Sequence, residues 1–394
     1  MIAVAPVALL GLLSFSIHLV FAQTTPGVDL YVFWTAGRKL LQESENPYSI
    51  DVTREIQLGI YGHYVQEGQD PMHFAYPPFA LIPVWPLLGL DFDWVQAIWL
   101  SFNLLILAVA LRMAAPRAPM WMIPLTFLFY PLVFGLILGN FAILIAVILM
   151  VTLARFLSNP STLSPFEQLG LGFIFAWTAA KPQFSWFFIL LFLLLAIRQR
   201  LVQFIAGFFT GFLSVLLFSF AVLPDWPARW LTQLLAYASA DPSNPPLQDY
   251  LSIVFPPSLV HQAIIFMIAL MVAASILFYA RWWKGSISTF SLLAWGGIAT
   301  FLLNPNGRAY EHIPYLIPLF FWVGASKSGS RALPWVFAAY ILATWALFFA
   351  SLRFFPLAAD RGMFIIFLPW LVLLICRNKS FLLREQYSPQ IVKP

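Results

Sequence analysis

Charged residues are scarce in this 394-residue chain: they make up 9% of it, whereas hydrophobic residues make up 61%. A soluble domain typically carries about 25% charged residues. Apolar runs of about 20 residues recur along the whole length, and this is the pattern of membrane-spanning helices. The composition therefore excludes an ordinary soluble domain and predicts an all-α polytopic membrane protein.

The sequence also lacks the residues of several common sites. Cys376 is the only cysteine, so no internal disulfide and no cysteine-based metal site is expected. His63, Glu67 and His73 do not have the spacing of a known metal-ligand motif. No Walker loop and no Gly-x-Gly-x-x-Gly turn is present. The aspartates Asp91 and Asp93 suit the start of a helix better than a site for a metal–nucleotide donor. We expect no metal and no cofactor.

Basic residues occur singly or in pairs between the apolar runs, as topology determinants do, so we expect no nucleic-acid partner. Residues 1–22 contain no Lys or Arg, so the basic region of a signal peptide is missing and a retained first span is predicted. The predicted spans number twelve. They cover residues 2–22, 94–112, 119–137, 140–157, 167–180, 183–197, 201–223, 259–280, 288–303, 312–325, 333–351 and 362–376.

The charges assign sides to the connecting loops. With the N-terminus inside, nearly every short inside loop is basic, as the positive-inside rule requires. All of the 16 carboxylates except Glu167 and Glu385 then fall outside. Loops 23–93 and 224–258 are the large outer loops. The same rule favours two spans that separate at Lys181-Pro182 over one kinked helix.

The first outer loop, residues 23–93, contains three predicted features. Apolar residues recur at helical spacing between Leu30 and Leu41, which predicts an amphipathic helix lying on the membrane. Residues 51–66 suggest a second surface helix. Residues 76–90 are apolar but too short to cross a membrane and contain four prolines, so we interpret them as a re-entrant or interfacial segment.

Asp29 begins the first predicted helix of this loop. One interpretation is an N-cap, in which the carboxylate accepts hydrogen bonds from the amides of Tyr31 or Val32. The other is a catalytic base. The two roles are compatible, because donors at a helix terminus keep an acid ionised and a base must be ionised before it accepts a proton.

Two further outer features contain polar residues that suit a phosphate and a sugar. Lys181, between two spans, is either a snorkelling lysine or a point charge for a lipid phosphate. The loop at 304–312 is dense in polar residues: Arg308 suits bidentate phosphate contact, His312 is a donor or proton carrier, and Asn304 and Asn306 offer amides to sugar hydroxyls. At Gly139-Asn140 a tight turn is expected, with a site as the alternative.

The predicted spans contain almost no ionisable residue away from their ends, except His18. Ion-coupled transporters place such residues at mid-membrane. The pattern therefore favours an interfacial enzyme over a pump, with a transporter or flippase of lipid-linked sugars as the alternative.

The set of outer motifs resembles the GT-C integral-membrane glycosyltransferases, in particular the family 87 mannosyltransferases that use polyprenyl-phosphate mannose. The likeness covers most of the chain. It rests on a short first span, Asp29, Asn46-Pro47-Tyr48, Tyr76-Pro77-Pro78, Lys181-Pro182 and the late loop with Pro305, Tyr310 and His312. Members of this family often have Gly-Gln where this chain has Gly139-Asn140.

The resemblance implies an inverting transfer of a mannosyl or related residue from a polyprenyl-phosphate sugar to an envelope glycolipid or glycan. Asp29 would deprotonate the acceptor hydroxyl. The donor phosphate would be held by Lys181, Arg308 and His312. The substrates would be contacted by Tyr76, Asn304, Asn306, Tyr310 and Glu311.

The expected architecture is a single transmembrane domain over residues 1–394, a GT-C-like bundle of about twelve helices. Amphipathic surface helices occupy its first outer loop, and residues 377–394 form a short cytoplasmic tail. We expect a multi-pass protein of the plasma membrane in contact with lipid, with its active site on the extracytoplasmic side.

Overall fold

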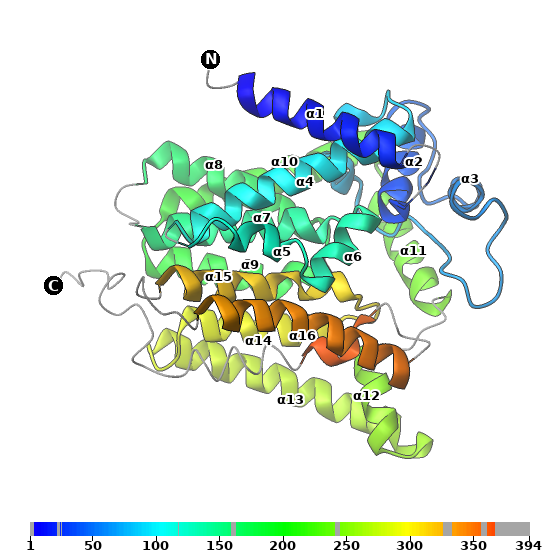
Figure 1. Ribbon diagram of the computed structural model, residues 1–394. Coiled ribbons are helices and arrows are strands. Elements are labelled where there is room, and N and C mark those ends of the chain that lie inside the picture. The colour runs from blue at the N-terminus through cyan, green and yellow to red at the C-terminus, as the bar shows by residue number, and fades with distance from the viewer. Residues whose placement is uncertain are drawn as a thin grey trace.

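The computed structural model describes residues 4–21, 24, 26–116, 118–158, 163–240, 245–325, 333–355 and 361–366, and all regular elements in these ranges are helices (Figure 1). The first half contains α1 (Val4–Phe21), α2 (Val28–Leu41), α3 (Ile50–Tyr61), η1 (Pro78–Leu81), η2 (Trp85–Leu87), α4 (Phe92–Ala114), α5 (Met122–Thr126), α6 (Tyr130–Leu138), α7 (Ala142–Ser158), α8 (Pro165–Ala176), η4 (Trp177–Ala180) and α9 (Pro182–Arg198). The second half contains α10 (Val202–Val222), α11 (Trp226–Ala240), α12 (Pro246–Val254), α13 (Pro257–Trp283), α14 (Thr289–Leu303), η5 (Ala309–Tyr315), α15 (Leu316–Ala325), α16 (Leu333–Phe354) and η7 (Met363–Ile366).

The described helices include four that are long and apolar enough to cross a membrane: α4, α10, α13 and α16. Four shorter apolar helices, α1, α7, α9 and α14, accompany them. The bundle is therefore helical and suited to a membrane, but the expected number of twelve spans is not confirmed. The last expected span, 362–376, and the tail at 377–394 lie largely or wholly outside the described residues.

The expected span 119–137 is wrong as a single helix. The chain forms α5, leaves helical geometry at Phe129, and starts again as α6. Pro131 has no amide hydrogen and therefore suits the first turn of a new helix. The amide of Tyr130 donates to Thr344 Oγ1 of α16 at 3.2 Å instead of continuing the helix. The break therefore exchanges a bond within a helix for a bond between helices.

Two predicted interruptions are present. The helix of α8 and η4 ends at Lys181, and Pro182 starts α9. Residues 76–90 contain only the 3₁₀ helices η1 and η2, of four and three residues. Because neither is long enough to cross a membrane, this segment does not move Asp29 to the opposite end of the bundle.

The predicted helix at 30–41 exists as α2, but it does not simply lie on a surface. Its buried residues occur around most of its circumference and include Leu30, Phe33, Ala36 and Leu40. Aromatic rings cover it: Phe33 stacks on Phe141 at 3.9 Å. The sequence pattern missed this burial because the covering residues are distant in the chain. The second predicted helix is present as α3.

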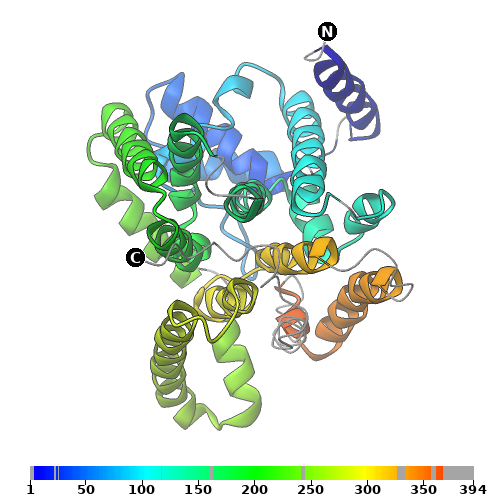
Figure 2. The same ribbon diagram turned by 90° about the vertical axis from the view of Figure 1, so that its left-hand side faces the viewer.

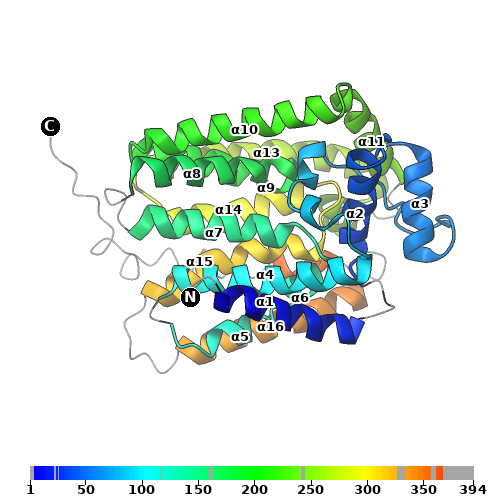
Figure 3. The same cartoon turned by 90° about the horizontal axis from the view of Figure 1, so that it is seen from above.

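The helices run roughly side by side, and α2, α3 and α11 gather at one end of the bundle (Figures 1 and 3). Figure 2 looks roughly along the helix axes and places α13 at the periphery, where its side chains are mostly exposed. Arg155 pairs with Glu167 at 2.9 Å, and both belong to loops predicted to lie inside.

Candidate active site

Asp29 lies in the first turn of α2, one residue after the helix begins. The N-cap is Gly27, and no side chain caps the amides at this end. The N-cap interpretation of Asp29 is therefore wrong. Its carboxylate Oδ2 accepts a hydrogen bond of 2.7 Å from Asn140 Nδ2 instead, so the side chain turns inward toward the α6–α7 connection.

The Gly139-Asn140 turn brings this amide to Asp29. Gly139 ends α6 with φ = 71°, a conformation that glycine adopts without strain. A Cβ at position 139 would lie 2.6 Å from Leu30 Cβ, so α2 can approach this closely only where a glycine stands. Asn140 is buried, and its Oδ1 accepts from the amide of Ala142 at 2.8 Å. The expected tight turn is present, and it holds the Asn140 amide against Asp29.

Burial and surrounding charges determine the proton affinity of Asp29. Burial of the carboxylate raises its pKa from 3.8 to about 6. The Asn140 hydrogen bond and the charges of Lys181 and Arg308 oppose this shift, while the charge of Asp70 adds to it. The donor that opposes the shift is the Asn140 side chain and not, as expected, the amides of the helix terminus. A pKa near 6 leaves the carboxylate mostly ionised at neutral pH and makes it a stronger base.

Lys181 and Glu311 form an ion pair of 3.1 Å in which both side chains are almost fully buried, 3% and 1% exposed. Glu311 also accepts hydrogen bonds of 2.6 and 2.7 Å from Asn304 Nδ2. This arrangement compensates the buried charges, as burial requires. Lys181 thus contacts the 304–312 loop through Glu311, a carboxylate that the sequence did not pair with it.

Two tyrosines, Tyr76 and Tyr310, are close enough to both Asp29 and Glu311 to be affected by their charges. Lys181 Nζ is 4.3 Å from the centre of the Tyr310 ring, a cation–π geometry. Tyr76 stacks obliquely on Phe33 of α2, with ring centres 4.6 Å apart. Burial raises the pKa of both phenols, and the charge of Asp29 raises it further. Both rings therefore belong to the same cluster as Asp29.

Arg308 contacts a carboxylate that the sequence did not single out. Its Nη2 lies 3.1 Å from Asp70 Oδ2, and the two side chains are 12% and 24% exposed. Asp70 also accepts hydrogen bonds from the Tyr237 hydroxyl of α11 at 2.9 and 3.0 Å. Arg308 and Asp70 are 238 positions apart in the chain, and no local pattern reports a contact of that kind.

His312 and Asn306 are placed differently from the other predicted residues. The buried His312 ring lies 4.2 Å from Phe301 and 5.3 Å from Tyr315, on the core of the bundle. Burial lowers the pKa of His312 to about 3, so the ring is neutral at physiological pH and brings no positive charge to a phosphate. Asn306 is half-buried, and its backbone N–H donates to Asn304 Oδ1 at 3.1 Å, as in a turn.

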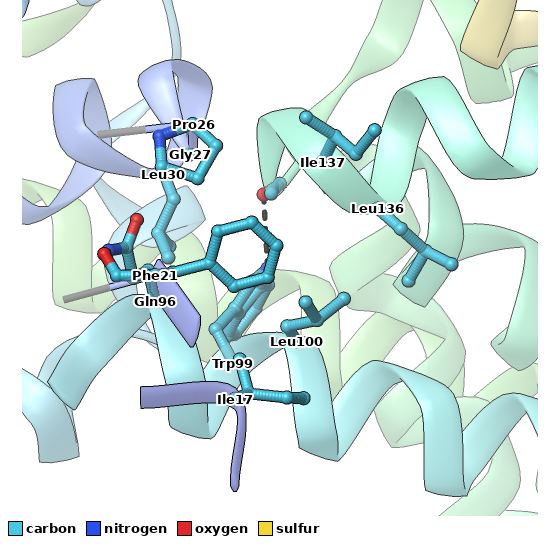
Figure 4. Close-up of a pocket in the computed structure, with 11 residues that line it drawn as sticks. Ile17, Phe21, Pro26, Gly27, Leu30, Gln96, Trp99, Leu100, Leu136 and Ile137 are labelled. Carbon is cyan, nitrogen blue, oxygen red and sulfur yellow. Dashed lines mark hydrogen bonds between the residues drawn. The ribbon is translucent and has the colours of Figure 1, made fainter. Parts of the chain in front are cut away.

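An apolar pocket adjoins Asp29 between α1, α4 and α6 (Figure 4). Its walls include Leu30, which follows Asp29, Gly27, two positions before it, and Gly139, which precedes Asn140. Gln96 is the only lining side chain with an amide, and its Nε2 donates to the Thr24 carbonyl at 2.8 Å. Figure 4 shows the remaining walls, formed by Ile17, Phe21, Pro26, Trp99, Leu100, Leu136 and Ile137.

The structure thus places most of the predicted residues at one end of the bundle. Asp29, Tyr76, Lys181, Tyr310 and Glu311 form one polar cluster. Arg308 joins it through its charge. The sequence analysis did not identify Asp70 or Tyr237 as site residues, and it favoured a plain turn at Asn140. In the described part of the chain, no three His, Cys, Asp or Glu side chains come together as metal ligands.

Comparison with known proteins gives one family. Residues 74–305 match the model of glycosyltransferase family 87, and this range is more than half of the chain. It includes Tyr76, Asn140 and Lys181, whereas Asp29 and Arg308 lie beyond its two ends. No curated protein and no solved structure matches significantly. The chain belongs to glycosyltransferase family 87, so it is a glycosyltransferase built on a bundle of apolar helices suited to a membrane.

Proposed function

We propose that this glycosyltransferase moves a mannosyl or related residue from a polyprenyl-phosphate sugar to an envelope glycolipid or glycan, with inversion at the anomeric carbon. The reaction takes place on the extracytoplasmic side of the plasma membrane. The observation that carries the proposal is the half-buried carboxylate of Asp29, held by Asn140 in a cluster that also contains Lys181. Such a carboxylate, with its raised pKa, is suited to general-base catalysis.

In this mechanism Asp29 accepts the proton of the acceptor hydroxyl while the hydroxyl oxygen bonds to the anomeric carbon. The bond from that carbon to the phosphate oxygen breaks on the opposite face, and the polyprenyl phosphate departs with the electron pair. One displacement of this kind inverts the configuration. The negative charge that develops on the phosphate is the charge that the protein must stabilise.

Lys181 and Arg308 are the cations for that charge. Each is already beside a carboxylate, Glu311 or Asp70, so each is held in place before the donor arrives. Fixed donors stabilise a developing charge without reorganisation at the moment of reaction. Tyr76, Tyr310 and the Asn304 amide lie in or beside the same cluster and suit contacts to sugar hydroxyls. Asn306 is half-buried at the turn. His312, being neutral, suits a hydrogen bond but not an ion pair.

The apolar pocket supports a lipid-anchored acceptor. Its lining includes Leu30, the residue after Asp29, and offers little to a polar group. A base must lie next to the acceptor hydroxyl, so a short stretch of hydrocarbon against this lining would leave the headgroup near Asp29. The leaving phosphate must lie on the other face of the sugar, as the inversion requires.

A transfer assay in detergent tests the proposal. The purified protein is mixed with polyprenyl-phosphate mannose and extracted envelope glycolipids, and the products are analysed by mass spectrometry. We expect a product heavier by one hexose, with the anomeric configuration opposite to that of the donor. An enzyme gives this product without closed compartments, whereas a flippase needs two. Absence of transfer with every polyprenyl-phosphate sugar would refute the proposed donor class.

A further inference from the structure

An extended strap, residues 70–76, crosses the outer end of the bundle between α3 and η1. It has no regular hydrogen-bonded structure of its own, yet side chains donate to four of its carbonyl groups. Tyr61 donates to the carbonyl of Asp70 at 3.0 Å, and Gln57 to that of Pro71 at 2.9 Å. Two more side chains complete the set at the far end of the strap: Trp230 to Ala75 at 3.1 Å and Tyr48 to Tyr76 at 2.7 Å.

The Asp70 carboxylate is where this strap meets the rest of the outer end. It accepts from the amide of Met72 at 2.9 Å, from the Tyr237 hydroxyl at 2.9 and 3.0 Å, and from Arg308 at 3.1 Å. These partners belong to the strap, to α11 and to the 304–312 loop. One carboxylate therefore joins three segments that are far apart in the sequence.

We propose that Asp70 is the positioning residue for Arg308, and that through Tyr237 it fixes α11 of the second large outer loop to the donor-phosphate site. A guanidinium on a long flexible side chain loses rotamer entropy when it binds a ligand. An ion pair formed beforehand removes part of that loss from the binding step. The inference rests on the proposed role of Arg308 in binding the donor.

The position of Asp70 also gives it a measurable effect on Asp29. The charged groups that act on Asp29 are Lys181, Asp70 and Arg308. The phenols of Tyr61, Tyr76 and Tyr310 are coupled to it as well. The negative charge of Asp70 raises the pKa of Asp29, and the positive charge of Arg308 lowers it. Removing the charge of Asp70 should therefore move the acidic limb of the rate profile to lower pH. Removing the charge of Arg308 should move it to higher pH.

The test compares Asp70→Asn, Arg308→Gln and Tyr237→Phe in the full-length protein, with polyprenyl-phosphate mannose as donor. Charge-assisted hydrogen bonds contribute about 1.5–3 kcal/mol, so we expect Asp70→Asn to raise the donor KM about tenfold or more, with kcat close to wild type. Its acidic limb moves to lower pH, and that of Arg308→Gln moves to higher pH. Tyr237→Phe removes one hydrogen bond and no charge, so the donor KM rises about threefold and the limb stays in place.

A purely structural role would lower the yield or kcat of all three variants without these opposite shifts. Limbs that move in the same direction for Asp70→Asn and Arg308→Gln would overturn the inference, and so would an unchanged donor KM in Asp70→Asn. If Asp70→Asn does not fold, an unchanged donor KM in Tyr237→Phe overturns it. Asp29→Asn separates the two proposals. If that variant is inactive and Asp70→Asn behaves as wild type, only the inference about Asp70 fails.

Discussion

Two ion pairs at the same end of the bundle differ in one respect that decides what each can do. Lys181 and Glu311 are 3% and 1% exposed, whereas Arg308 and Asp70 are 12% and 24% exposed, and both pairs are 3.1 Å long. A buried pair is costly to break because either partner alone becomes an uncompensated charge. A pair near the surface is partly hydrated and can exchange partners. The Lys181–Glu311 pair, here called the inner pair, therefore fixes the structure. The Arg308–Asp70 pair, the outer pair, is the more available to an arriving phosphate.

The largest effect is expected from breaking the inner pair. Glu311→Gln leaves Lys181 buried without its partner, and a loss of this kind costs about 3–5 kcal/mol. We expect a marked fall in the thermal unfolding midpoint in detergent. A Lys181→Met/Glu311→Leu double variant replaces the pair by apolar side chains and should recover most of that stability. It should still be inactive in transfer, because Lys181 is gone. A stable and fully active double variant would remove Lys181 from the mechanism.

The second effect is on the pH dependence of transfer. Asp29 has a pKa of about 6 and must be ionised to accept a proton. Below that value, kcat/KM should fall about tenfold for each pH unit, and above it the profile should level off. Steady-state assays between about pH 4.5 and 8 measure this pH profile, because the range includes about pH 6 and the ordinary aspartate limb begins near its lower end. An acidic limb centred near the ordinary aspartate pKa would show that burial does not govern this base.

A smaller effect is expected from breaking the outer pair. Asp70→Asn keeps the shape of the side chain and removes its charge, and the pair is partly hydrated. We expect a loss of stability of about 1 kcal/mol, well below that of Glu311→Gln. Thermal unfolding of the two variants in the same detergent compares them directly. Equal losses would mean that exposure does not distinguish the two pairs.

The smallest effect concerns the apolar pocket beside Asp29. Ile137→Trp puts a larger ring on its wall and should raise the acceptor KM only about two- to threefold, because the ring takes space that a lipid acceptor would fill. Leu19→Trp is the matched control, because Leu19 is 65% exposed on α1 and does not line the pocket. The two variants are compared by their acceptor KM. Equal values for both would separate the pocket from acceptor binding.

The sequence predicted the parts of this site that follow from composition and side assignment. Asp29, Lys181 and the 304–312 loop were expected on one face because the charges of the loops alternate. Lys181 contacts Glu311 of that loop, and the charges of Lys181 and Arg308 act on Asp29. It could not predict which carboxylate pairs with which cation. Glu311 with Lys181 and Asp70 with Arg308 are contacts between distant segments, and hydrophobic periodicity carries no information about them.

The errors in the fold have similar causes. The pattern at 119–137 is uniformly apolar, so it did not show that Tyr130 bonds to Thr344 and ends one helix before the next begins. The amphipathic spacing in α2 predicted a surface helix, because rings such as Phe141 that cover its other side come from distant positions. The N-cap expectation failed because Asn140, held by the turn at Gly139, attracts the carboxylate of Asp29 inward.

The central claim is that Asp29 is the base, and the most direct measurement is the rate of a single turnover by Asp29→Asn with donor binding measured in parallel. Asparagine keeps the shape but cannot accept the proton, so we expect transfer to fall by about 10²–10⁴-fold. Donor affinity should stay close to that of wild type. Because folding raises the pKa of Asp29 from 3.8 to about 6, the ionised carboxylate destabilises the folded protein once the pH rises through this range. Asparagine removes that cost, so the variant should unfold no earlier than wild type at pH 7. A folded Asp29→Asn protein that binds donor and transfers sugar at the wild-type rate would contradict the claim.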